Sequence, residues 1–309
     1  MHRVRAGRSD GTLSDRTIRA FAPAIAGGFV VGVRPKEAAS VVAEPGSEPA
    51  VECIALERRY GDVAAVDGVS FTVARGEFFA LLGPNGAGKT TTVNVLTTLS
   101  PPTSGSARVL GHDVVERPQD VRRSLGMVFQ DPALDDGLTA RETLALHAVL
   151  YEVPRAERRD RIGRALAWAT LEGAADRRVR TFSGGMKRRL ELARALVHEP
   201  GVLLLDEPTL RLDPQGRRNL WDRIEDLRQG GMTVLMTTHY LHEAASCDRV
   251  GILDHGRLVA LGAPGDLVAA MPGADDLEAV FLALTGRALS DEPGRSRAPA
   301  VRASRGVLG

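Results

Sequence analysis

Apolar residues along this chain follow two kinds of pattern, which alternate from about residue 51 onward. Strand-length runs come first, amphipathic stretches follow after about residue 130, and strand-length runs return beyond residue 200. The strand-length runs are VECIAL, VSFTV, EFFALL, VLLLD, TVLMTT and RVGIL. Because continuous apolar strands that alternate with helices are typical of a parallel sheet covered on both faces, the pattern predicts an α/β fold.

The middle of the chain shows helical spacing. In AERRDRIGRALAWATLEGAA, Ile162, Leu166 and Ala169 recur at i, i+4 and i+7, so they share one face of a predicted helix. A second helix is predicted after TFSGG. Its apolar face consists of Met186, Leu190, Ala193 and Val197.

The two ends of the chain lack such patterns. Residues 1 to about 50 mix Arg, Gly, Ala, Ser and Pro, and the last 20 residues are polar and basic. We expect a disordered leader or an overextended start site at 1–50, and a disordered tail at the other end. The apolar patch AIAGGFVVGV in the leader resembles a signal-peptide core, but no clear small-residue cleavage site follows it, so we do not expect secretion.

Composition limits which cellular compartment and which classes of partner we expect for this chain. The formal net charge of +1 gives no general reason to expect nucleic acid binding. Cys53 and Cys247 lie far apart and form no metal-binding spacing, which favours a reducing cytosolic compartment. The apolar runs are well short of the roughly 18 residues that span a bilayer, so we expect a chain that is soluble by itself. Only three of the 40 basic residues are lysines, and two of them, Lys89 and Lys187, lie in glycine-containing motifs.

The strongest chemical signal is a glycine-rich turn between a predicted strand and a predicted helix, in EFFALLGPNGAGKTTT. Gly83, Gly88, Lys89 and Thr90 fit the pattern G-x-x-x-x-G-K-[ST]. Glycines let backbone N–H groups turn inward around phosphate oxygens, and the helix N-terminus adds the positive end of its dipole. Lys89 can reach the β and γ phosphates, and the Thr90 hydroxyl can ligate Mg²⁺. The alternative is a glycine-rich turn that binds nothing. The predicted nucleotide-binding residues of this phosphate loop are Gly83, Pro84, Asn85, Gly86, Ala87, Gly88, Lys89, Thr90 and Thr91.

A second glycine motif lies about 95 residues further on, in TFSGGMKRRLELARALVHEP. Taken alone, Ser183, Gly184 and Gly185 before a helix form an ordinary N-cap. The next strand-like run ends in Asp206 and Glu207, a costly pair at a buried strand end unless cations offset the charge. In this order, the three motifs resemble the ATP-binding cassette family, the nucleotide-binding subunits of ABC transporters.

The resemblance covers residues from about 52 to 286. It implies an α/β P-loop NTPase cassette with a RecA-like parallel-sheet core, an antiparallel β subdomain and a helical subdomain. The implied cassette spans 51–262, with the helical subdomain at about 131–199, and 263–309 form a short C-terminal extension and tail. The phrases TFSGGMKRRLELARALV and LEAVFLALTGR most resemble the daunorubicin-resistance branch of drug-export ATPases. Many members of that branch have a longer segment where this chain has MPGADD, so no regulatory role of that segment is implied here.

The resemblance assigns roles to three residues that would be structural if taken alone. Tyr60 corresponds to the aromatic residue that stacks on adenine. Gln130 corresponds to the glutamine that touches Mg²⁺ and the attacking water, and the loop after it faces the membrane partner. His239 corresponds to the switch histidine that contacts the γ-phosphate.

The same resemblance separates the paired acids by role. Asp206 is expected to hold Mg²⁺ together with Thr90 and Gln130, and Glu207 is expected to polarise the water that attacks the γ-phosphate. ATP would thus be hydrolysed to ADP and phosphate. The implied catalytic residues are Lys89, Gln130, Glu207 and His239.

In the family, the SGG motif completes the site of a second subunit, so the resemblance implies a head-to-tail homodimer with ATP sandwiched between cassettes. Ser183, Gly184 and Gly185 would meet the partner's γ-phosphate, and Asp213 would line the interface. Asp213 also has the position of an N-cap for the predicted helix PQGRRNLWDRIEDLRQ. A separate membrane permease would supply the pore, with this chain at the cytoplasmic face of the cell membrane. The implied function is export of a drug-like or lipid-like substrate.

Two other interpretations compete with export. A soluble ABC-type ATPase of translation or DNA repair would act on nucleic acid. Translation-type members commonly join two cassettes and repair-type members carry a long coiled coil, and this sequence has neither. A GTPase-like regulatory protein would carry an N-K-x-D motif, which the sequence lacks. We therefore expect no nucleic acid partner.

One stretch departs from the family pattern. The family usually places a small hydroxyl residue and then Gly or Ala where this chain has Leu210 and Arg211. We expect the bulky leucine and the charged arginine to crowd a close backbone approach in the dimer, or to add a cation near phosphate. ATP binding should then be normal and turnover lower.

Overall fold

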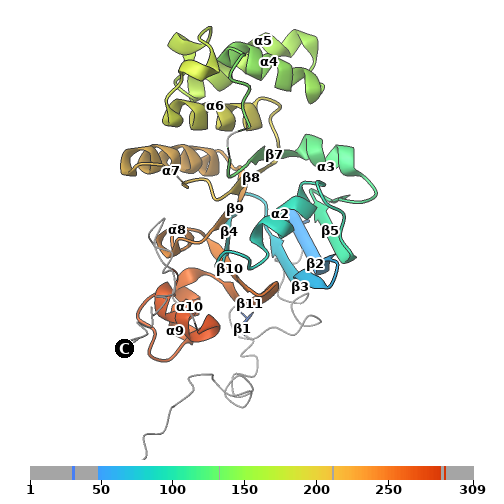
Figure 1. Cartoon of the computed structure of the whole chain (residues 1–309), viewed down its shortest axis with the longest axis vertical. Helices are drawn as coiled ribbons and strands as arrows, with labels where there is room; N and C mark the ends of the chain where they lie inside the picture. The colour runs from blue at the N-terminus through green and yellow to red at the C-terminus, as the bar shows by residue number, and fades with distance from the viewer. Residues whose placement is uncertain (1–29, 32–47, 132, 211, 287–288, 290–309) are drawn as a thin grey trace, which may run out of the picture.

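The computed structural model describes residues 30–31, 48–131, 133–210, 212–286 and 289. Most of the predicted leader, all of the predicted tail and Arg211 lie outside the described residues. The described residues form two sheets, a group of helices at one end of the molecule and further helices along the larger sheet (Figure 1). This arrangement confirms the predicted α/β cassette with an antiparallel β subdomain and a helical subdomain.

The larger sheet has seven strands. They are β1 (Val30–Val31), β4 (Phe78–Leu82), β7 (Leu125–Val128), β8 (Val202–Asp206), β9 (Thr233–Thr238), β10 (Arg249–Asp254) and β11 (Arg257–Gly262). Their order is β1-β11-β10-β4-β9-β8-β7, and the five strands from β10 to β7 pair in parallel. β11 pairs antiparallel with β10 on one side and with β1 on the other. Two residues of the predicted leader therefore continue this sheet at its edge. Every residue of β4, β8 and β9 is buried, as expected for strands covered on both faces.

The smaller sheet covers one face of the larger one (Figure 1). Its antiparallel strands, in the order β3-β2-β5-β6, are β3 (Val63–Val73), β2 (Val51–Tyr60), β5 (Ser104–Val109) and β6 (His112–Asp113). Helices α2 (Lys89–Leu96) and α3 (Pro118–Ser124) contribute to the same core. Phe71 of β3 and Phe79 of β4 stack there with ring centroids 5.3 Å apart. Because successive strand residues point to opposite faces, Phe78 belongs to the core on the other face.

Helices of the second half of the chain cover that other face. They are α7 (Pro214–Gln229), α8 (Leu241–Ala244), α9 (Pro264–Ala270) and α10 (Leu277–Thr285). Asp213 Oδ1 accepts a hydrogen bond from Gly216 N at 2.6 Å, which confirms the predicted N-cap of α7. In the part of the chain that the structure describes, no helix combines the length and the apolar character needed to cross a membrane.

The helical subdomain lies at the top of Figure 1. It contains α4 (Ala140–Leu150), α5 (Arg155–Trp168) and α6 (Gly184–Leu196), with short 3₁₀ turns at Glu172–Ala174 and Val179–Thr181. The residues predicted to share the inner faces of α5 and α6 do meet in one core, with Met186 at its margin. The buried ones are Ile162, Leu166, Ala169, Leu190, Ala193 and Val197.

A cluster of aromatic rings ties α4 to the end of α6. The Tyr151 ring lies between His147 and His198, with ring centroids 4.4 Å and 4.1 Å away. Burial, and then the positive charges of Arg194 and His198, lower the pKa of His147 to about 3. His147 is therefore neutral in the folded chain at pH values where the unfolded chain protonates it.

This difference predicts a loss of stability in weak acid. A histidine whose pKa is depressed by folding contributes its full stability above the unfolded value of about 6.5, and loses it as the pH falls below that value. We expect His147→Phe, which keeps an aromatic ring in place, to lose about 2 kcal/mol less of its unfolding free energy than the native chain when the pH falls from 7 to 5. Urea unfolding of both chains at pH 7 and pH 5 measures this difference. A measurement at pH 8, where position 147 is uncharged in both the folded and the unfolded states, serves as the reference. Equal pH dependence in the two chains would contradict the assignment.

Candidate active site

The residues expected to bind and hydrolyse a nucleotide follow four neighbouring strands of the parallel sheet. The phosphate loop follows β4, His239 follows β9, Asp206 ends β8, and Gln130 comes shortly after β7. In the sheet these strands lie in the order β4-β9-β8-β7. Because ligands of open α/β sheets bind beyond the carboxyl ends of the strands, the four motifs line one continuous edge.

Glycines of the phosphate loop allow backbone contacts that a side chain would prevent. A Cβ atom on Gly83 would lie 2.5 Å from Leu253 O, and one on Gly88 would lie 2.5 Å from Ala65 O. Gly88 also has φ +104°, a conformation that residues with a side chain rarely adopt. Because Ala65 belongs to β3, these contacts fix the loop between the two sheets.

Lys89 lies inside the loop that it follows. Its Nζ donates hydrogen bonds to Gly83 O at 2.7 Å and Pro84 O at 3.1 Å, and lies 3.4 Å from Glu207 Oε1. Burial lowers the pKa of Lys89, and the Glu207 and Asp206 carboxylates oppose that effect. The adjoining residues Asn85, Gly86 and Thr90 are exposed, so this face of the loop is open to a ligand.

Thr237, in β9, orients both acids although the sequence patterns did not single it out. Its hydroxyl donates to Asp206 Oδ1 and accepts from Glu207 N at 3.0 Å. Asp206 Oδ1 also accepts from Thr90 Oγ1 at 3.5 Å. Burial raises the pKa of Asp206, the Thr237 hydroxyl lowers it, and the neighbouring Glu207 charge raises it again, with a net increase. The signal for Thr237 in the sequence is a polar pair at the end of the apolar run TVLMTT.

Glu207 lies between two groups that stabilise its charge. His239 Nδ1 is 3.3 Å from Glu207 Oε1, the same oxygen that faces Lys89. Burial alone raises the pKa of Glu207, but the His239 ring and the Lys89 ammonium lower it below its ordinary value. The buried Lys89 and Glu207 and the half-buried His239 are therefore brought together as a group with an ionised carboxylate at its centre.

Two further predicted residues lie at the margin of this group. Gln130 is exposed, and no hydrogen bond between described residues joins it to Thr90 or Asp206. Tyr60 ends β2, is 48% exposed, and has the Arg58 guanidinium carbon 4.6 Å from its ring centroid. The β2–β3 hairpin that carries Tyr60 also contains Ala65, whose carbonyl lies beside Gly88 of the phosphate loop. The exposed Tyr60 ring is therefore on the same hairpin that borders the loop.

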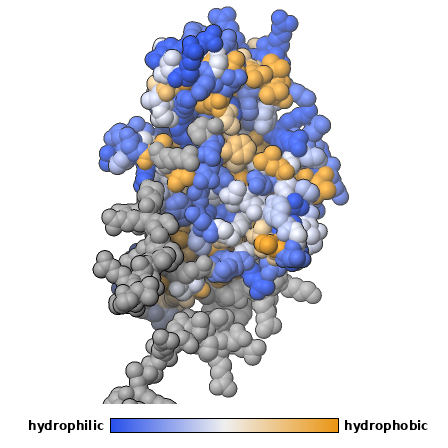
Figure 2. Space-filling view, in the orientation of Figure 1, coloured by the Kyte–Doolittle hydropathy of each residue, from blue (hydrophilic) through white to orange (hydrophobic). Residues whose placement is uncertain are grey.

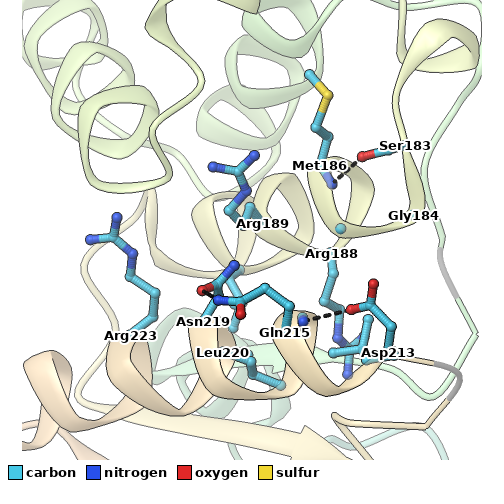
Figure 3. Close-up of a pocket in the computed structure, with 14 residues that line it drawn as sticks. Ser183, Gly184, Met186, Arg188, Arg189, Asp213, Gln215, Asn219, Leu220 and Arg223 are labelled. Carbon is cyan, nitrogen blue, oxygen red and sulfur yellow. Dashed lines mark hydrogen bonds between the residues drawn. The ribbon is translucent and has the colours of Figure 1, made fainter.

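The SGG motif and Asp213 lie at a different place. Together they line a cavity of about 490 Å³ between the start of α6 and the start of α7, and no residue of the phosphate loop lines it. Figure 3 shows the two helices facing each other across this space. Ser183 Oγ accepts a hydrogen bond from Met186 N at 3.3 Å, so the N-cap expected from the sequence is present. The predicted site residues thus divide into two sets on one chain.

Three buried charged residues near the segment that follows Glu207 were not singled out from the sequence. They are Arg188, Glu191 and Glu243. The Arg188 and Glu191 side chains form an i, i+3 pair on α6, a spacing that could have drawn attention to them. Glu243 accepts hydrogen bonds from Thr209 and Thr238 at the same sheet edge.

Comparison with known proteins agrees with this geometry. A family model described as ABC transporter matches residues 66–210. The chain is 44% identical to the Nod factor export ATP-binding protein I of Paraburkholderia xenovorans, over 75% of this chain and 76% of that protein. It is also 44% identical to the daunorubicin resistance ATP-binding protein DrrA3 of Streptomyces coeruleorubidus, over 76% of this chain and 74% of that protein.

A solved structure extends the likeness to the fold. It is described as a dimeric post-hydrolysis state of the ATP-binding cassette MJ0796 bound to ADP and Pi. It matches with a TM-score of 0.62 at 28% identity, over 69% of this chain and 98% of that one. This chain belongs to the ABC transporter family, as an ATP-binding and ATP-hydrolysing subunit.

Proposed function

We propose that this chain hydrolyses ATP with Mg²⁺ at the candidate active site, and that hydrolysis drives export of a drug-like or lipid-like molecule through a separate membrane permease. The observation that carries the proposal is the contact of Lys89 and His239 with Glu207 beside the phosphate loop. The relatives named for Nod factor export and daunorubicin resistance support export as the direction of transport.

The residues at the sheet edge fit a nucleotide with a bound magnesium ion. Among the described residues, no group of three or more His, Cys, Asp or Glu side chains could hold a metal by itself. Mg²⁺ commonly binds through one or two protein oxygens, waters and the substrate's phosphates, and the Thr90 hydroxyl beside the Asp206 carboxylate offers such oxygens. We assign Gln130 as the third protein ligand, and we assign the exposed Tyr60 ring to stack on adenine.

The protein groups around Glu207 support its role as the residue that polarises water. A carboxylate whose pKa lies below the ordinary value is ionised at neutral pH and can accept a hydrogen bond from an attacking water. Lys89 and His239 supply positive or donating groups next to it for the phosphate oxygens. Mg²⁺, when bound, would neutralise charge on those oxygens.

The separate cavity at the SGG motif supports a head-to-tail homodimer. Ser183, Gly184, Gly185 and Asp213 are held away from the loop of their own chain, so a second copy is needed to place them on a nucleotide. The N-terminus of α6 would present its backbone N–H groups to the partner's γ-phosphate. The dimeric cassette structure noted above supports this assembly.

An apolar stripe on α4 supports a membrane partner. Leu146, Val149 and Leu150 are 52%, 49% and 67% exposed, and their spacing places them on one side of the helix. Figure 2 shows apolar side chains gathered at the upper right of the molecule, where the helical subdomain lies. We assign this stripe, which follows the loop after Gln130, to contact the permease at the cytoplasmic face of the membrane.

The domain boundaries belong to the same proposal. The cassette would span 51–262, with the helical subdomain at about 131–199. Residues 263–309 would form a short extension, whose described part contains α9 and α10. Residues 1–50 would precede the cassette as a leader.

Replacing the catalytic carboxylate tests the proposed chemistry. We expect Glu207→Gln to lower the rate of ATP hydrolysis by at least about a hundredfold, because an amide cannot act as a base. ATP affinity should change little, and the dimer should accumulate in ATP. Phosphate release, nucleotide binding and size-exclusion chromatography measure the three effects. Glu157→Gln, at an exposed position of α5, is the matched control, and a full rate in Glu207→Gln would overturn the assignment.

The Leu210–Arg211 pair generates a separate prediction. We expect Leu210→Thr with Arg211→Gly to raise the turnover of ATP roughly two- to tenfold, which corresponds to about 0.4 to 1.4 kcal/mol in the barrier. The KM for ATP should stay the same, because the pair lies outside the phosphate loop. An unchanged rate beside the native chain would show that the pair is tolerated variation.

Capture of membrane proteins tests the α4 stripe. We expect the native chain, immobilised with ATP, to retain a membrane protein that has no cassette of its own. Changing Leu146, Val149 and Leu150 to Gln should reduce that retention at least about tenfold, because their burial supplies the contact energy. The control variant Leu282→Gln, which changes another exposed apolar position, should retain the membrane protein as well as the native chain does. Retention of ribosomes or DNA instead would favour the translation or repair alternative.

A further inference from the structure

One buried arginine on α6 contacts two backbone segments of the active-site edge. Arg188 is 7% exposed. Its Nε donates to Pro208 O at 3.0 Å, and its Nη1 donates to Phe129 O at 2.8 Å and to Glu191 Oε2 at 3.1 Å. A single planar guanidinium therefore joins three segments that are far apart in sequence.

The two carbonyls that Arg188 binds are next to the residues assigned to the attacking water. Pro208 directly follows Glu207, and Phe129 directly precedes Gln130. Arg188 itself lies five residues after Ser183, on the helix that the SGG motif begins. In Figure 3 its side chain extends from α6 toward the segment that carries Asp213, while Ser183 lies above it in the view.

Glu191 extends this contact to the far side of the segment after β7. It is fully buried, and its Oε2 accepts from Arg188 while its Oε1 accepts from Ala133 N at 3.0 Å. The Arg188–Glu191 pair thus holds the chain on both sides of Gln130. A movement of α6 that kept these bonds would carry that segment with it.

A second buried acid attaches the segment after Glu207 to the rest of the core. Glu243 accepts hydrogen bonds from Thr209 Oγ1 and from Thr238 Oγ1, the residue before His239. The segment is therefore bound by Glu243 on the His239 side and by Arg188 on the α6 side. The position of α6 relative to the sheet should then affect where Glu207 lies.

We propose that Arg188, supported by Glu191, is a positioning residue for ATP hydrolysis. It fixes the backbone beside Glu207 and beside Gln130 to the SGG helix, so that a contact made by Ser183, Gly184 or Gly185 aligns the residues around the attacking water. The inference rests on the roles proposed above for Glu207 and Gln130. It adds a physical connection within one chain between the two sets of site residues.

The geometry requires an arginine rather than a positive charge alone. A guanidinium presents donors in a fixed planar fork, whereas a lysine ammonium is a single point at the end of a flexible chain. Arg188→Lys can still neutralise Glu191, but one ammonium cannot bridge Pro208 O and Phe129 O with the same geometry. This substitution therefore separates the compensation of charge from the bridging of the two carbonyls.

Steady-state kinetics of the full chain tests the proposal with two variants. For Arg188→Lys, and for Arg188→Met combined with Glu191→Gln, we expect kcat to fall about ten- to a hundredfold, because small misplacements of reacting groups have effects of that size. The KM for ATP should stay within about twofold, since neither residue contacts the phosphate loop. The double variant leaves no unpaired buried charge, and the amide oxygen that replaces the Glu191 carboxylate can still accept from Ala133 N.

Controls distinguish positioning from simple packing. Arg161→Met with Glu199→Gln removes another ion pair next to α6, at 3.2 Å, and should leave kcat unchanged. Thermal unfolding of all variants shows which of them are folded. A native kcat in Arg188→Lys, or a loss of kcat that follows only the fall in folded protein, would overturn the proposal. Absence of ATPase activity in the native chain would instead contradict the proposed function itself.

Discussion

Parallel pairing of β4, β9 and β8 is the constraint on which the rest of the site depends. Leu82 pairs with Thr238 and Asp206 pairs with Thr237, so the three strands end at the same level. The residues that follow each strand then meet without any long loop to bring them together. Lys89, Glu207 and His239 come from three separate parts of the sequence, and this register places Lys89 and His239 within ion-pair distance of Glu207.

Charge balance explains why such an edge can be buried. Lys89, Asp206 and Glu207 would each be costly alone in a dry environment. Here the ammonium faces one carboxylate, and the Thr237 hydroxyl satisfies the other. Among the described residues, the Lys89 ammonium contacts two backbone carbonyls and Glu207, each of which a phosphate group could replace. The same contacts that stabilise this edge therefore leave it ready for a polyanion.

Much of this structure could be predicted from the sequence, because the signals concerned are local. Strand runs, the faces of α5 and α6, the phosphate loop and the N-caps at Ser183 and Asp213 depend on residues close together in the chain, and the structure has them where expected. Contacts to backbone carbonyls could not be predicted, since every residue has a carbonyl and only the fold selects which one an arginine meets. The acceptors of Arg188 are of this kind. The pairing of Val30–Val31 with β11 was also missed, because the composition around it is typical of a disordered segment.

The segment from Glu207 to Asp213 connects the two sets of site residues through a short stretch of chain. Leu210 N donates to Glu207 O at 3.2 Å, and Leu212 N donates to Thr209 O at 3.1 Å, so described residues of this segment hydrogen-bond to one another. Arg188 and Glu243 hold its beginning, and the Asp213 N-cap holds its end beside the SGG motif. These contacts hold both ends of the segment to neighbouring elements. The unusual Leu210 lies in the middle of this segment, and its effect on turnover would then act on Glu207 as well as on the surface between two copies.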